Sequence, residues 1–315
     1  MSSDVVKDRL IVVLGPTATG KTRLSVSIAK ALRADIVSGD SMLVYRGFDI
    51  GSAKPDVDER NGVRHALVDI LEPSENFSVT DFQRLAAAEI HANNGAGKIP
   101  ILVGGTGLYL KALLEGYRFN PETKDSQYRA SLEKLANEHG RAYVHALLEK
   151  VDPKTAARLH VNDLRRVIRA LEVSRFGDAR ISQNKREHGL EYDALVLGLR
   201  CERSELYRRI EARVDNMMAA GLEDEVRRLL ASGVSRHAQA MQGIGYKEMA
   251  SYIYGESTLN DAVAEIKKAT RHFAKRQITW YKKMPYIHWL DIDKGSFETT
   301  MERAMCEIHR HFDKQ

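Results

Sequence analysis

The 315-residue sequence has only two cysteines and no apolar run of 18 or more residues. Cys201 and Cys306 stand far apart and outside any C-x-x-C pattern, which argues against a disulfide framework or a cysteine-based zinc site. The absence of a long apolar run argues against a membrane span. The first ten residues contain Asp4 and Asp8 and no apolar segment, so they do not resemble a secretory signal. We therefore expect a protein of a reducing cytoplasm.

The chain also lacks the sequence patterns of several metal sites. Its eleven histidines form no H-x-x-x-H pair and no cluster with cysteine, and no D-D-x-x-D is present. A transition-metal site is therefore not predicted.

The positive charge is concentrated in two segments, although the net charge is only +5. Residues 158–186 contain eight Arg or Lys against three acidic residues, and residues 265–285 contain seven against one. The rest of the chain is therefore net acidic. Charge alone leaves two interpretations open, which are solvated helix faces and a surface for a polyanion.

Short apolar runs alternate with helical patterns over the first 120 or so residues. The runs at 9–15, 34–40, 65–71 and 98–105 predict strands, and helical patterns at 22–32 and 77–94 lie between them. Ser78 and Asp81 form a capping-box pattern at the start of the second helix. Such alternation predicts a parallel sheet with helices on both faces.

The strand pattern stops near residue 121. Helical periodicity continues to about residue 190, a further strand is predicted at 194–200, and long helices are predicted at 205–221, 222–233 and 264–284. We therefore expect an α/β fold with a P-loop NTPase-like core formed by residues 1–120 and 191–315. An all-helical insertion domain, residues 121–190, interrupts it.

The stretch GPTATGKT at residues 15–22 fits the phosphate-loop pattern G-x-x-x-x-G-K-[ST] between a strand and a helix. Its glycines allow backbone N–H groups to turn inward, Lys21 adds a charge, and the Thr22 hydroxyl can bind Mg²⁺. The predicted phosphate site comprises Gly15, Pro16, Thr17, Ala18, Thr19, Gly20, Lys21 and Thr22. The pattern does not say which phosphate it binds.

Evidence for ATP as the bound phosphate compound is weak. P-loop NTPases usually have an apolar strand that ends in an Mg²⁺-binding Asp, but the run at 98–105 ends in glycine. The run at 65–71 contains Asp69, which keeps the possibility open. No arginine-rich lid of the nucleoside-kinase kind is evident.

Two further loops are predicted at the carboxyl edge of the sheet, where ligands bind in such folds. Asp40 follows the second strand and is a candidate general base or Mg²⁺ ligand, or else a turn residue or helix cap. Thr106 lies among glycines in GGTGLY, which either contact a ligand or only form a tight turn.

The helical patterns add further candidate residues. Arg165, Arg166 and Arg169 lie beside an apolar stripe. Gln277 stands on an apolar stripe, where it either hydrogen-bonds the core backbone or reads a base edge. Arg213 either reaches the phosphate site or forms a structural ion pair.

Six motifs in order resemble the bacterial tRNA dimethylallyltransferases. They are GPTATGKT, DSMLVYRGFDIGSAKP, LVGGTGLYLKALLEG, NDLRRVIRALEV, QGIGYKE and KRQITW, which span residues 11 to about 290. The resemblance implies that the phosphate loop holds dimethylallyl diphosphate with Mg²⁺. The dimethylallyl group would pass to N6 of the adenosine 3′ of the anticodon, and pyrophosphate would leave.

The resemblance also implies roles for individual residues. Asp40 corresponds to the general base, while Lys21, Thr22 and Mg²⁺ stabilise the leaving group. From its position after the strand at 194–200, and not from the resemblance, Arg213 is included as a candidate diphosphate-binding residue. Leu43 stands where many members have glutamine, and it cannot make an amide hydrogen bond. The residues that match tRNA-contacting stretches are Asp40, Ser41, Met42, Leu43, Thr106, Arg129, Arg165, Arg166, Val167, Ile168, Arg169, Gln242, Gly243, Ile244, Gly245, Tyr246, Lys247, Lys275, Arg276, Gln277, Ile278, Thr279, Trp280, Tyr281 and Lys282.

The insertion is expected to hold the anticodon stem, and we expect the protein to be a monomer.

Three alternative functions are also compatible with the phosphate loop. They are an adenylate isopentenyltransferase that acts on free AMP, ADP or ATP, a P-loop small-molecule kinase, and an RNA-binding ATPase switch without transfer chemistry. The basic segments and the helical insertion favour the tRNA enzyme over the first of these.

Overall fold

A computed structural model describes residues 6–119, 126–175 and 189–313. The chain divides into two compact units. The first combines Met1–Leu114 with Leu190–Gln315, and the second is Glu115–Gly189. No helix within the described ranges is both long and apolar enough to cross a membrane.

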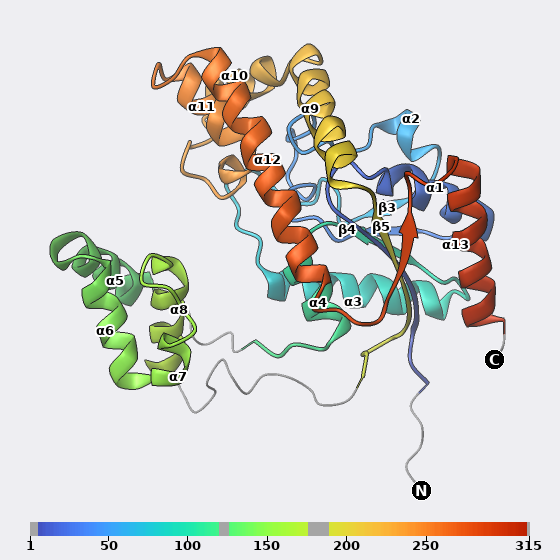
Figure 1. Cartoon of the computed structure of the whole chain (residues 1–315), viewed down its shortest axis with the longest axis horizontal. Coiled ribbons are helices and arrows are strands. Elements are labelled where there is room, and N and C mark those ends of the chain that lie inside the picture. The colour runs from blue at the N-terminus through green and yellow to red at the C-terminus, as the bar shows by residue number, and fades with distance from the viewer. Residues whose placement is uncertain (1–5, 120–125, 176–188, 314–315) are drawn as a thin grey trace, which may run out of the picture. The chain divides into compact units, whose positions relative to one another are not determined.

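The first unit is built on a six-stranded sheet whose strands are all parallel (Figure 1). The spatial order is β3-β2-β4-β1-β5-β6. The strands are β1 (Arg9–Leu14), β2 (Ile36–Ser38), β3 (His65–Ala66), β4 (Ile101–Gly104), β5 (Asp193–Arg200) and β6 (Ile287–Asp291). The expected parallel α/β sheet is thus confirmed.

Two strands differ from the sequence analysis. β6 was not predicted, because as an edge strand it buries only part of its length and exposes His288. β3 is much shorter than the predicted strand at 65–71, because Leu67 and Asp69 adopt left-handed backbone conformations that end it. Asp69 therefore does not end a strand in the manner of an Mg²⁺ ligand. Its carboxylate pairs with Lys54 and, at 3.7 Å, with Arg60.

Helices cover both faces of this sheet, as the pattern predicts. One face buries Ile11 and Val13 against α1 (Lys21–Leu32) and α13 (Phe297–Phe312). The other buries Leu10 and Val12 against α3 (Val79–Gly95), α4 (Gly107–Leu114) and α10 to α12. The remaining helices of the unit are α2 (Val57–Arg60), α9 (Arg203–Ala219), α10 (Leu222–Ala231), α11 (Tyr246–Ile253) and α12 (Leu259–Tyr281).

Local signals explain some helix ends and miss others. Ser78 and Asp81 form the expected capping box at α3. The sequence analysis predicts no helix at α2, α11 or α13. In α13 the buried positions include Thr300 and Ala304, which give a weak apolar stripe.

The described residues of the second unit form helices and connecting loops, without a strand, and have their own core. It contains α5 (Ser126–His139), α6 (Arg141–Val151), α7 (Pro153–Ala156) and α8 (Leu164–Arg175). Leu132, Val144, Leu148 and Leu171 are buried together. α7 is only four residues long, although helical periodicity suggested 155–160. The basic positions beyond residue 175 lie outside the described residues.

The second unit is inserted where the first closes on itself. The N–H of Glu191 donates a hydrogen bond of 2.8 Å to the carbonyl of Leu114. The chain thus leaves the sheet domain and re-enters it at one point. β5 then pairs directly with β1 in the middle of the sheet.

Candidate active site

Three loops meet at the carboxyl edge of the sheet because β2, β4 and β1 are neighbours. The N–H of Gly39 donates to the carbonyl of Val103 at 2.7 Å. The N–H of Ser41 donates to Oγ1 of Thr106 at 3.3 Å. The structure therefore brings the Asp40 loop and the Thr106 loop together beside the phosphate loop.

The conformation of the phosphate loop is stabilised by its own backbone and side chains. Gly20 begins α1 in a left-handed conformation, with φ 79°, which a glycine adopts without strain. Thr19 Oγ1 and Lys21 Nζ donate to the carbonyl of Pro16, at 2.8 and 2.9 Å. The Thr22 hydroxyl makes no hydrogen bond to the part of the chain that the structure describes. The loop therefore leaves this hydroxyl available for a ligand.

The site concentrates positive charge around one carboxylate. Burial and the nearby Arg213 lower the pKa of Lys21 to about 7, although Asp40 opposes the shift. Burial also lowers the pKa of Arg213. Burial raises the pKa of Asp40, against the backbone N–H groups of Met42 and Leu43 and both cations. Within the described ranges neither Lys21 nor Arg213 has an ion-pair partner, so the alternative of a structural ion pair for Arg213 is not supported.

Helix α12 presents two buried polar side chains to this site. Gln277 Oε1 accepts from the N–H of Thr17 at 3.0 Å, and its Nε2 donates to the carbonyl of Gly105 at 2.8 Å. The Tyr281 hydroxyl lies 3.1 Å from the carbonyls of both Gly15 and Gly105. Gln277 therefore bonds backbone, the first of the two alternatives for it. The side chains of Gln277 and Tyr281 are 3% and 1% exposed, so this structure does not present them to tRNA, and the expected tRNA contact at these two residues stays a prediction.

The other residues of the predicted tRNA-contacting stretch 275–282 are partly packed inward and partly exposed. Ile278 packs in a cluster with Leu206 and Ile210, and Trp280 packs against the main core. The side chains available to a large ligand are those of Lys275, Arg276, Thr279 and Lys282, which are exposed. Only part of the predicted stretch can therefore meet RNA through side chains.

The segment 242–247 divides in the same way. Tyr246 is fully buried, and its hydroxyl donates to Glu225 Oε1 at 2.7 Å, so this structure does not present its side chain to tRNA. A Cβ added to Gly243 would lie 2.7 Å from Cε of Met42, which places this segment against the Asp40 loop. Gln242 and Lys247 are exposed.

In the second unit, α8 turns its apolar residues inward. Val167 and Ile168 are 0% and 3% exposed, so this structure does not present their side chains to tRNA. Arg129 binds the buried Glu172 through two hydrogen bonds of 2.9 and 2.7 Å, and Arg169 reaches the same carboxylate at 3.3 Å. Arg165 is exposed and has no ion pair among the described residues.

Part of the basic segment at 265–285 is neutralised by α9, which sequence reasoning missed. Lys267 pairs with Asp215 at 2.6 Å and Arg271 with Glu211 at 2.8 Å. The cations of α12 that stay without acidic partners in the described structure lie nearer its carboxyl end.

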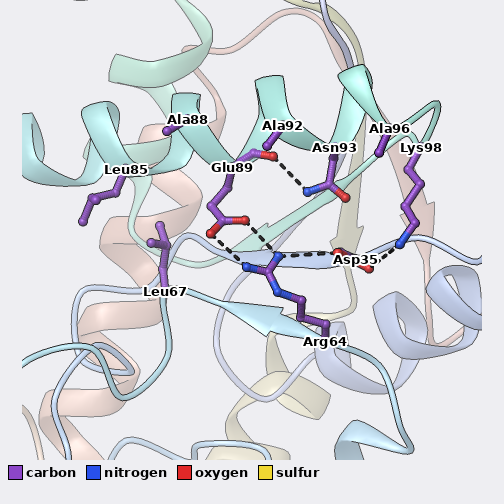
Figure 2. A pocket seen from close by; sticks show the side chains of 10 residues that line it. All are labelled: Asp35, Arg64, Leu67, Leu85, Ala88, Glu89, Ala92, Asn93, Ala96 and Lys98. Atoms are coloured by element: carbon purple, nitrogen blue, oxygen red, sulfur yellow. Dashed lines mark hydrogen bonds and ion pairs between the residues drawn. The ribbon is translucent and has the colours of Figure 1, made fainter.

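A cavity of about 470 Å³ lies away from this site (Figure 2). Asp35, Arg64 and Lys98 on its rim precede β2, β3 and β4, which places it at the amino ends of the strands. Figure 2 shows Arg64 bonded to Glu89 and Asp35, and Asp35 bonded to Lys98. Because these charged side chains are paired with one another, the cavity has no unpaired charge among them that could bind a charged ligand.

The fold and site define a P-loop α/β protein with a helical insertion. The family described as IPP transferase matches residues 43–284. The tRNA dimethylallyltransferase of Bacillus cytotoxicus is 46% identical over 291 residues, which is 92% of each chain. That of Symbiobacterium thermophilum is 50% identical over 285 residues, 90% of this chain and 89% of the relative.

Solved structures agree. The tRNA isopentenylpyrophosphate transferase of Bacillus halodurans is 42% identical, with a TM-score of 0.74 over 98% of each chain. A eukaryotic dimethylallyltransferase that acts on tRNA is 28% identical, with a TM-score of 0.83 over 98% of this chain and 80% of that one. The chain belongs to the IPP transferase family.

Proposed function

We propose that this protein transfers the dimethylallyl group of dimethylallyl diphosphate to N6 of the adenosine 3′ of the anticodon in tRNA. The new C–N bond forms as the allylic C–O bond breaks. The electron pair of that bond leaves with pyrophosphate. The N6 proton passes to Asp40.

The observation that carries this proposal is the unbalanced positive charge at the phosphate loop. Lys21, Arg213 and the amino end of α1 lie near the Asp40 carboxylate, and Glu59 also acts on Arg213, but neither cation forms an ion pair among the described residues. A diphosphate supplies the missing negative charge. As the C–O bond breaks, the same groups stabilise the charge that grows on the departing oxygen.

The residues at the phosphate loop fit a magnesium ion, which the Thr22 hydroxyl and the Asp40 carboxylate would help to hold beside the diphosphate. The free Thr22 hydroxyl and the Asp40 carboxylate are oxygen donors, which suit Mg²⁺. No cluster of three His, Cys, Asp or Glu suited to a metal occurs in the described residues, so the chain alone does not cage one. When bound, Mg²⁺ supplies further charge neutralisation to the diphosphate.

Asp40 is suited to hold and deprotonate the amine. Its Oδ1 accepts from the N–H of Met42 at 2.8 Å, and the N–H of Leu43 also favours the charged carboxylate, so the backbone of this loop orients the side chain. Burial raises its pKa, so it accepts a proton more readily than an ordinary aspartate does. Thr106 lies on the neighbouring loop and is available to orient the base.

For the acceptor, we propose tRNA over free adenylate. In the sheet unit, Lys275 and Arg276 of α12, together with Lys282 and Lys247, are exposed cations that suit a phosphate backbone, and Arg165 is an exposed cation of the second unit. The target base must leave the anticodon-loop stack to reach Asp40, at a cost of a few kcal/mol. A free nucleotide bound at Asp40 is too small to require these additional cations.

The test is transfer of radiolabel from dimethylallyl diphosphate, with Mg²⁺, to two acceptors in parallel. One is an unmodified anticodon stem–loop with adenosines at the third anticodon base and the next two positions, and the other is AMP. We expect label in the stem–loop alone. Label in AMP alone would identify a free-adenylate prenyltransferase. Absence of label from both would overturn prenyl transfer.

A further inference from the structure

The inward face of α12 joins the two loops between which transfer would occur. Gln277 and Tyr281 are four residues apart, so they project from the same face of the helix. Gln277 bonds the backbone of Thr17 in the phosphate loop and of Gly105 in the loop after β4. The Tyr281 hydroxyl lies between the carbonyls of Gly15 and Gly105.

This junction is tightly packed as well as hydrogen-bonded. A Cβ added to Gly105 would lie 2.3 Å from Nε2 of Gln277, and one added to Gly107 would lie 2.8 Å from Cβ of Trp280. The loop after β4 therefore lies directly against the helix. Both polar side chains are almost fully buried, where hydrogen bonds are strong and costly to break.

The junction continues to Asp40 through neighbouring residues. Thr106 follows Gly105 and exchanges hydrogen bonds with Ser41 through its Oγ1. Ser41 in turn adjoins Asp40. Displacing Gly105 from α12 would therefore change the separation between the phosphate loop and the carboxylate.

We propose that Gln277 and Tyr281 are positioning residues that set the distance between the donor diphosphate and the amine held by Asp40. The inference rests on the proposed function. Neither side chain needs to touch a substrate, because each acts through the backbone of Gly15, Thr17 or Gly105. A misplacement of about 1 Å in such a site costs on the order of 100-fold in rate.

The test compares Tyr281→Phe and Gln277→Met with Tyr45→Phe in the full-length protein. Tyr45 is as buried as Tyr281, but its hydroxyl makes no hydrogen bond to Gly15 or Gly105, so it is the matched control. We measure kcat with both substrates saturating, KM for the stem–loop, and the folded fraction by urea titration.

We expect kcat per folded molecule to fall by about 10–100-fold in both variants, with the stem–loop KM changed by less than about threefold. Tyr45→Phe keeps the wild-type kcat. Because both side chains hold the Gly105 carbonyl, the double variant loses less than the product of the single losses. An unchanged kcat per folded molecule in both variants, even with a reduced folded fraction, would show that these residues only stabilise the fold and would overturn the proposal.

Gly105→Ala probes the same junction from the other side and serves if Gln277→Met does not fold. Its new methyl group would displace the Gln277 amide, so we expect a comparable fall in kcat. A wild-type kcat for this variant would also contradict the proposal.

A second experiment distinguishes failure of the proposed function from failure of the positioning role. If the wild-type protein transfers no label, the junction is tested by calorimetric binding of inorganic pyrophosphate with Mg²⁺. We then expect affinity to fall about tenfold in Tyr281→Phe and Gln277→Met, because both loosen the phosphate loop. Unchanged pyrophosphate affinity would overturn the positioning role independently of prenyl transfer.

Discussion

Asp40 combines two properties that seldom occur together at one carboxylate. It is flanked by cations, which favour its charged form, yet burial raises its pKa. Its Oδ1 is fixed by the N–H of Met42. The side chain is thus oriented and also able to take up a proton during transfer.

Asp40→Asn is expected to lower kcat by about 10²–10⁴-fold, because the amide cannot accept the N6 proton. Asparagine keeps an oxygen for the Met42 N–H, so the loop and the affinity for the stem–loop are expected to persist. Single-turnover transfer and fluorescence anisotropy measure the two quantities. A wild-type rate in this variant would remove Asp40 from the role of base.

Lys21 makes donor binding depend on pH. Its pKa is about 7 in the free site, and the negative charge of a bound diphosphate raises it. The contribution of Lys21 to proton uptake on binding is therefore expected to be close to one proton larger at pH 8 than at pH 6. Calorimetry of pyrophosphate binding in buffers of different ionisation enthalpy measures total uptake. Because pyrophosphate itself titrates in this range, the contribution of Lys21 is the uptake of the wild type minus that of Lys21→Met at each pH. Equal uptake in wild type and variant would contradict the assignment.

The same shift fixes the sign of the contribution of Lys21 to stability. Between pH 7 and the ordinary pKa of 10.5, the unfolded chain holds this proton and the folded chain does not. The contribution of Lys21 to the free energy of unfolding therefore rises with pH across this window.

At the scale of elements, continuous apolar runs predicted the interior strands well because both faces of those strands are buried. The same reasoning missed β6, an edge strand with exposed His288, and it placed Asp69 at the end of a strand that stops at Ala66. Left-handed turns at Leu67 and Asp69 have no strong local sequence signal in non-glycine residues.

The loops that form the site could be predicted from the sequence, but the long-range contacts that hold these loops in place could not. The residues of GPTATGKT alone predict the conformation of the phosphate loop. The parallel sheet then places the loops of Asp40 and Thr106 beside it, because all three follow strands at the same edge. The partners of Gln277 lie 260 and 172 residues away in sequence, so no periodicity identifies them. The neutralisation of Lys267 and Arg271 by α9 is of the same long-range kind.

The helices of the second unit allow a test that separates structure from recognition at Arg129. Among the described residues, Arg129→Ala leaves the buried Glu172 paired with Arg169, so we expect a loss of about 1–3 kcal/mol in the free energy of unfolding. Adding Glu172→Leu should recover most of it. Arg165→Ala, at an exposed and unpaired side chain, should leave stability unchanged.

Chemical denaturation and stem–loop affinity are measured for each of these variants. If Arg129 also binds RNA, the stabilised double variant will still bind weakly and with a smaller dependence on salt. Full recovery of affinity with stability would assign Arg129 to the fold alone.

At the scale of the whole molecule, the two units divide the work that a tRNA-modifying enzyme requires. The sheet unit contains every residue placed in the transfer chemistry. The insertion has a separate apolar core and contributes Arg165. Because Glu191 bonds Leu114 where the insertion begins and ends, the sheet unit is closed without it.

Replacing residues 116–189 by a short Gly/Ser linker is therefore expected to leave the sheet unit folded. The linker spans ends that already meet, so closing it costs little entropy. Pyrophosphate affinity should stay within about threefold of the full-length value, while stem–loop affinity falls by about 100-fold as phosphate contacts are lost. Calorimetry and anisotropy measure these two affinities. Loss of pyrophosphate binding in a folded variant would show that the insertion shapes the phosphate site, and an unchanged stem–loop affinity would place RNA recognition on α12 and segment 242–247.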